Sequence, residues 1–80
     1  MSLKTGNQMK AARALSGLSQ KELADIAEVD VGTVRNLEAS AGGPLRGRFE
    51  TVAKIQSALE TVGVEFTNGD TPGVRLKGKP

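Results

Sequence analysis

The part of the sequence that most constrains the fold is residues 18–38, which carries the signals of two short helices only a few residues apart. Ser19 and Glu22 have the spacing of a capping box, which predicts a helix that begins at Gln20. The apolar residues that follow recur with a helical period: Leu23, Ala24, Ile26 and Ala27. We expect this helix to cover about residues 20–27.

A second helix is predicted over about residues 31–39, with Asp30 as its N-cap because the carboxylate can accept from free N–H groups of the first turn. Val34 and Leu37 then point to one side of this helix. Ala24, in the preceding helix, is small enough to lie where two helices cross steeply. The stretch therefore predicts a helix-turn-helix.

A further helix is expected on each side of this unit. Before it, Thr5 and Gln8 suggest another capping box and a helix over about residues 6–16, ended by Gly17, with an inner face of Met9, Ala12 and Leu15. After it, residues 39–47 form a loop rich in glycine. The last helix should begin near residue 49 and end at residue 63, with an inner face of Phe49, Val52, Ile55, Leu59 and Val62.

The tail changes to the alternating pattern of strands. Residues 64–66 and 74–76 each read apolar, charged, apolar, and the segment between them is rich in turn formers, including Asn68-Gly69. The fold class is therefore mainly α: four helices with a helix-turn-helix, followed by a C-terminal β-hairpin or extended tail. We divide the chain into a helix-turn-helix domain (1–62) and a hairpin or tail (63–80).

Composition limits the chemistry. The 80 residues contain no Cys and no His, which excludes thiol nucleophiles, disulfides and imidazole metal ligands, so we expect no metal and no cofactor. No apolar run reaches the roughly 18 residues of a membrane span, and no signal peptide is visible, so we expect a cytoplasmic protein without a membrane partner. The net charge of +2 produces only a weak electrostatic attraction for DNA, which disfavours a nonspecific nucleoid-type DNA-binding protein.

Residues 5–62 resemble the XRE-like family, the helix-turn-helix domain of lambdoid phage repressors, Cro proteins and their bacterial relatives. The resemblance rests on three segments: Leu18-Ser19-Gln20-Lys21-Glu22-Leu23-Ala24, Val34-Arg35-Asn36-Leu37-Glu38, and Glu50-Thr51-Val52. It implies double-stranded operator DNA as the partner, bound by a homodimer with the second helix of the motif in the major groove.

The resemblance also implies roles for individual residues. The positions that face base edges are Val31, Gly32, Thr33 and Asn36, while Gln20 and Arg35 lie beside the DNA backbone. Arg13 and Glu38 match a pair that ties the first helix to the third. Glu28 occupies the turn position where relatives commonly have Gly, so a positive φ there would cost about 1 kcal/mol.

The residues themselves support part of this assignment. Thr33 and Asn36 are three residues apart and so share a helix face, and Asn can pair with adenine N6 and N7. The Val31 side chain could touch a thymine methyl group. Basic side chains placed around the motif are candidate phosphate ligands: Lys10, Lys21, Arg35, Arg46 and Arg48.

We do not expect this protein to be an enzyme. Glu22, Asp25 and Glu28 form acidic pairs at helical spacing, but we interpret them as a solvated face. Gly42-Gly43-Pro44 lacks the strand and the spacing of a phosphate-binding loop.

The favoured function is a transcriptional regulator. We expect it to be a repressor that blocks polymerase by occupying the operator, since 80 residues leave no room for an effector domain. The hairpin is the candidate dimer element because exposed strand edges pair readily, with an interface of Val64, Phe66, Val74 and Leu76. The alternative is an antitoxin-type module that binds a protein partner through its apolar tail.

Overall fold

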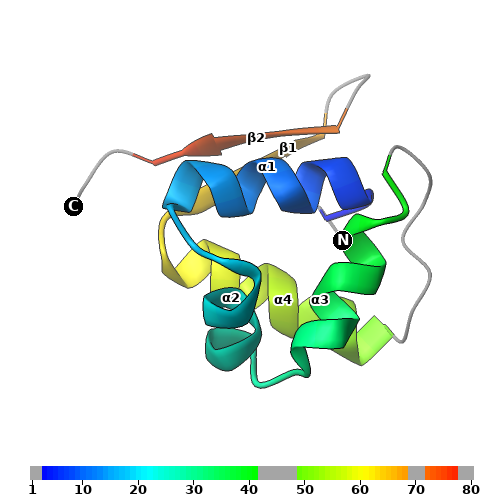
Figure 1. The fold of residues 1–80 in the computed structure, drawn as a ribbon. Helices are drawn as coiled ribbons and strands as arrows, with labels where there is room; N and C mark the ends of the chain where they lie inside the picture. Colours follow the sequence, from blue (N-terminus) through cyan, green and yellow to red (C-terminus); the bar gives the residue numbers. More distant parts are fainter. Residues whose placement is uncertain (1–2, 42–48, 69–71, 78–80) are drawn as a thin grey trace.

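The computed structural model describes residues 3–41, 49–68 and 72–77. The elements follow in the order α1 (Gly6–Ser16), α2 (Gln20–Ala27), α3 (Val31–Glu38), α4 (Phe49–Thr61), β1 (Val64–Asn68) and β2 (Pro72–Leu76). In Figure 1 the hairpin lies along α1, and α2 and α3 lie on the other side of α1. The predicted class, four helices followed by a β-hairpin, is confirmed. None of the helices in the described ranges is long and apolar enough to cross a membrane.

Two of the predicted helix caps form as expected. The Ser19 hydroxyl accepts from the Glu22 N–H at 3.0 Å, and the Glu22 carboxylate accepts from the Ser19 N–H at 2.8 Å, which completes the capping box of α2. Asp30 accepts from the Gly32 N–H at 2.8 Å and caps α3. Because side chains satisfy these terminal N–H groups, the starts of both helices are fixed locally.

The cap of α1 differs from the prediction in one bond. Thr5 accepts from the Gln8 N–H at 3.0 Å, but the Gln8 side chain does not return to Thr5. Its Oε1 accepts from the Lys4 N–H at 2.7 Å, and its Nε2 donates to the Gly73 carbonyl at 3.0 Å. Gln8 is buried, so both ends of its amide need partners. The side chain therefore joins α1 to β2.

The core lies between the four helices and the inner face of the hairpin. Its largest fully buried side chains are Met9, Leu23, Ile55, Leu59, Val34 and Val64. Leu3 is also buried, and its N–H donates to the Gln56 side chain of α4 at 3.0 Å. The segment before α1 is thus held against the last helix.

Two residues that were predicted on inner faces, Phe49 and Leu15, are exposed, and so is Ile26 of the predicted apolar stripe. Phe49 is 73% exposed, because the buried stripe of α4 begins at Val52, one turn after the first residue of the helix. Leu15 is 45% exposed at the end of α1, and Ile26 is 44% exposed on α2. A helical period assigns a residue to a face, but it does not say how far the neighbouring elements extend over that face.

The hairpin is antiparallel and pairs Val64 with Leu76, Glu65 with Arg75, and Phe66 with Val74. Since side chains alternate across a strand, the apolar pairs share one face and the charged pair lies on the other. Phe66 and Val74 pack against the helical core, and Glu65 forms an ion pair with Arg75. The predicted turn dipeptide Asn68-Gly69 lies partly outside the described residues.

Candidate nucleic-acid interface

The turn between α2 and α3 contains a residue in the left-handed region. Glu28 has φ 60° and ψ 44°, and its N–H donates to the Asp25 carbonyl at 3.3 Å while the N–H of Val29 donates to the Ala24 carbonyl at 3.0 Å. These two bonds close the end of α2 and turn the chain into α3. The backbone therefore has the positive φ considered for Glu28, at a strain of about 1 kcal/mol.

Helix α3 is divided into a buried face and an outer face. Val34, Leu37 and Glu38 are buried. Asn36 and Arg35 are exposed, and the residues of the first turn, Val31, Gly32 and Thr33, are half-buried. The buried face fixes the helix, so the candidate reading residues Thr33 and Asn36 are presented by a rigid element.

Gly32 differs from the other candidate readers because its backbone N–H is already used by the Asp30 carboxylate. A Cβ at this position would lie 2.8 Å from Asp30 Oδ2, an atom at the end of a side chain that can move. The Gly32 N–H is therefore not free to bind a partner. What Gly32 contributes is the absence of a side chain, which lets a partner approach the helix closely.

A buried carboxylate connects the first three helices. Glu38, 2% exposed, accepts from Arg13 Nε at 2.8 Å and from Arg13 Nη2 at 3.1 Å. It also accepts from Gln20 Nε2 at 3.2 Å, and Arg13 Nη1 donates to the Leu18 carbonyl at 3.0 Å. The hydrogen bond to Glu38 raises the pKa of Arg13. We call Arg13, Glu38 and Gln20 the Glu38 network.

The Glu38 network includes the ion pair suggested by the family resemblance, but the contact of Gln20 with Glu38 had no signal in the sequence. Because an ionised carboxylate can only accept, the Gln20 amide must turn its nitrogen toward Glu38. This leaves its Oε1 and one N–H for a ligand. The orientation of the Gln20 amide is therefore set by a contact within the protein.

The candidate phosphate ligands differ in their surroundings. Lys10 and Arg35 are exposed. Lys21 pairs with Asp25 at 3.2 Å, but both side chains are largely exposed, so the pair is weak and the ammonium group stays accessible. Arg46 and Arg48 lie outside the described residues.

Gly6 is a second residue that sequence reasoning missed. A Cβ at Gly6 would lie 2.5 Å from the Leu37 carbonyl oxygen and 2.9 Å from that of Glu38. The next residue, Asn7, donates its N–H to the Ala41 carbonyl at 2.8 Å. Only glycine lets the first turn of α1 approach the end of α3 this closely. A glycine at the first position of a helix was the available signal.

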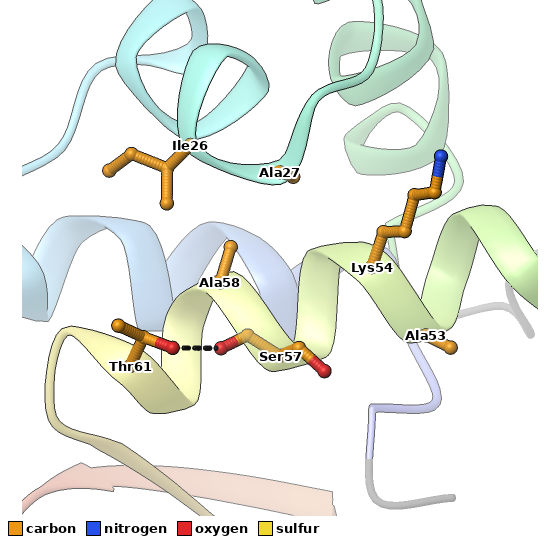
Figure 2. Close-up of a pocket in the computed structure, with 7 residues that line it drawn as sticks. All are labelled: Ile26, Ala27, Ala53, Lys54, Ser57, Ala58 and Thr61. Carbon is orange, nitrogen blue, oxygen red and sulfur yellow. Dashed lines mark hydrogen bonds between the residues drawn. The ribbon is translucent and has the colours of Figure 1, made fainter.

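A shallow groove of about 440 Å³ lies between α2 and α4. Figure 2 shows Ile26 reaching from α2 toward α4, with Lys54 near one end and Thr61 donating to the Ser57 carbonyl. The remaining lining residues are Ala27, Ala53 and Ala58. The acidic residues considered in the sequence, Asp25 among them, do not line this groove.

A helix-turn-helix whose second helix is anchored on one face and polar on the other defines a class of DNA-binding proteins. The family model described as helix-turn-helix, of the XRE type, matches residues 9–65. The chain therefore belongs to the XRE-like helix-turn-helix family and is a DNA-binding regulator of that type. This family is one of DNA-binding rather than enzymatic domains. A search of curated proteins gave no match.

Proposed function

We propose that this protein is a transcriptional repressor that binds a palindromic operator as a homodimer, with α3 in the major groove. The observation that carries this proposal is the division of α3: Val34, Leu37 and Glu38 are buried, while Asn36 is exposed. A helix fixed in this way presents the same side chains to every base pair that it meets, which direct readout requires.

In the proposed complex the Asn36 amide donates to adenine N7 and accepts from adenine N6–H, and Thr33 uses its hydroxyl or its methyl group. Val31 contacts a thymine methyl group, and Gly32 allows the helix to approach the base edges. Backbone phosphates bind Gln20 and the basic side chains around the motif: Lys10, Lys21, Arg35, Arg46 and Arg48.

The proposed dimer and the proposed palindrome share one symmetry. A protein with a two-fold axis matches two half-sites that lie one helical turn, about 34 Å, apart. Residues 1–62 would form the DNA-binding unit, and the hairpin would supply the contact between copies. Val64 is only 1% exposed because it lies in the core of its own subunit, so it does not contribute to the proposed interface. Occupation of the operator in the cytoplasm would block transcription directly.

The test is selection from a randomised duplex pool at two salt concentrations. We expect a palindromic consensus for the wild type and loss of that consensus for Asn36→Ala, with salt-sensitive nonspecific binding retained. We also expect Thr33→Ala to weaken the selected consensus, and Thr61→Ala, which changes an exposed threonine on α4, to leave it unchanged. The absence of an enriched sequence, or identical behaviour of Asn36→Ala and wild type, would contradict the proposal.

The antitoxin-type alternative relies on Phe66, Val74 and Leu76 as a surface for a protein partner. Phe66 and Val74 pack against the protein's own helices, which leaves less of this surface for another chain. Isolation of a stoichiometric protein partner from native cells would favour the alternative.

A further inference from the structure

The outer edge of β2 has backbone groups that the hairpin does not use. The Lys77 N–H donates to the Gly63 carbonyl at 2.8 Å, one step beyond the pair Val64 and Leu76. Gly63 and Lys77 thus form a hydrogen-bonded pair. Because hydrogen-bonded and non-hydrogen-bonded pairs alternate along an antiparallel ladder, Val64–Leu76 and Phe66–Val74 are non-hydrogen-bonded pairs. The N–H and C=O groups of Val74 and Leu76 therefore point away from β1.

An apolar patch flanks this edge. Gln8 of α1 bonds Gly73 of β2, and Figure 1 shows the two elements running in the same direction from there. Leu15 is seven residues after Gln8 on the same helix face, an axial rise of about 10 Å, and Leu76 is three residues after Gly73, also about 10 Å. The two leucines thus lie at the same level, and they are 45% and 43% exposed.

The edge is complementary to itself. If two copies of β2 pair antiparallel about a two-fold axis at Val74, the midpoint of the strand, all five residues of each strand overlap. Arg75 then lies opposite Gly73 of the second copy, so no like charges meet. A two-fold axis at Arg75 would place the two arginines directly opposite each other and shorten the overlap.

From these observations we infer that the outer edge of β2 is the dimer interface, where two copies form a continuous four-stranded antiparallel sheet centred on Val74, with Leu15 and Leu76 of each copy covered at its margin. The inference rests on the proposed homodimer and specifies its interface. A second copy in this symmetric register pairs the N–H and C=O groups of Val74, gives the Leu76 N–H the Pro72 carbonyl of the other copy, and covers the apolar patch. The Leu76 carbonyl faces Pro72, which has no N–H to donate.

The first test compares lysine substitutions at two apolar residues of equal exposure. Leu15→Lys places a charge at the proposed interface, and Ile26→Lys adds the same charge at the 44% exposed residue in the groove between α2 and α4. In sedimentation of the full chain without DNA, we expect Leu15→Lys to weaken the dimer about tenfold or more, and Ile26→Lys to leave it unchanged. Equal effects of the two variants would overturn the inference.

The second test addresses the strand edge itself. Val74→Pro removes an N–H that the hairpin does not use and should yield a monomer. Val74→Ala removes more of the side chain but keeps the N–H, and should still dimerise. A dimeric Val74→Pro variant would overturn the inferred interface and leave the proposed homodimer intact. If Val74→Pro loses the helical signal in circular dichroism, the variant is not folded and a second comparison replaces it. In sedimentation we then expect Leu76→Lys, but not Ile26→Lys, to weaken the dimer.

A wild-type chain that stays monomeric at every concentration would also overturn the inferred interface. Titration with the selected operator then decides the proposed function separately. Binding of two monomers to a palindrome would preserve the repressor proposal, and binding without sequence preference would remove it.

Discussion

The side-chain amide of Gln20 donates to the buried carboxylate of Glu38 across 3.2 Å, which links the first residue of α2 to the last residue of α3. The same carboxylate holds Arg13 of α1 by two hydrogen bonds. One carboxylate thus sets the relative positions of three helices. The contact also means that the stability of the fold and the orientation of Gln20, a candidate DNA ligand, depend on the same group.

We expect Arg13→Ala to destabilise the protein by about 3–5 kcal/mol, because it leaves the 2% exposed carboxylate of Glu38 without its cation. Thermal and urea unfolding measure this loss. Arg13→Lys should recover part of it, since lysine restores the charge but not the two-pronged geometry. A melt of Arg13→Ala equal to that of the wild type would contradict the structural role of the Glu38 network.

The sign of the pH dependence follows from the pKa of Arg13, which is raised in the folded protein by its bond to Glu38. A raised folded-state pKa contributes stability below the unfolded-state pKa of arginine and loses it only above the folded-state value. We therefore expect the difference in unfolding free energy between wild type and Arg13→Ala to stay constant from neutral to moderately alkaline pH. A steady decline of this difference over that interval would be inconsistent with the pair.

Gln20→Glu should be more harmful than Gln20→Ala. Both variants lose a hydrogen bond to a charged group, worth about 1.5–3 kcal/mol. The glutamate also places a second carboxylate against Glu38, and we expect this repulsion to add roughly 1–3 kcal/mol to the loss. Lowering the pH should selectively rescue Gln20→Glu in a thermal melt. If the two variants melt alike at neutral pH, the contact between Gln20 and Glu38 is not maintained in solution.

Glu28→Gly should stabilise the protein by about 1 kcal/mol, because glycine adopts the left-handed conformation at φ 60° without the steric cost of a Cβ. The reverse change supplies the control. Gly17→Ala, at φ 75° in the corresponding position of α1, should destabilise by a similar amount. Chemical denaturation of the two variants measures both changes, and a lower midpoint for Glu28→Gly would contradict the assigned turn.

Gly6→Ala should destabilise the protein although alanine is the better helix former. A Cβ 2.5 Å from the Leu37 carbonyl forces α1 and α3 apart, at a cost of about 1–3 kcal/mol. Gly32→Ala makes the same change in the first turn of α3, where only the end of the Asp30 side chain must move, and should cost less. A more stable Gly6→Ala variant in thermal melts would show that the two helices are not in such close contact.

Local signals in the sequence were sufficient for much of the fold. The capping box at Ser19, the cap at Asp30 and the glycine at position 17 each act within one helical turn, and the helices begin or end where these residues predict. The hairpin followed from strand alternation. In the candidate site, the assignment of Asn36 to the exposed face of α3 depended only on helical spacing.

What the sequence did not reveal depends on contacts between distant residues. The exposure of Phe49 and Leu15 is set by how far other elements extend over them. The bond from Gln8 to Gly73 spans 65 residues, and that from Gln20 to Glu38 joins two helices at an angle that spacing does not determine. These positions have side chains that are unremarkable in isolation, and only the tertiary arrangement gives them their partners.

The separation of the two faces of α3 has a consequence for engineering. The residues that anchor the helix, Val34, Leu37 and Glu38, are different from the candidate reading residues, of which Asn36 is exposed and Thr33 is half-buried. Substitutions of exposed Asn36 should therefore leave the fold nearly untouched, and those of half-buried Thr33 should do so where the new side chain is of similar size. If these two residues read base edges as proposed, a library randomised at both positions would sample new operator preferences on nearly the same scaffold.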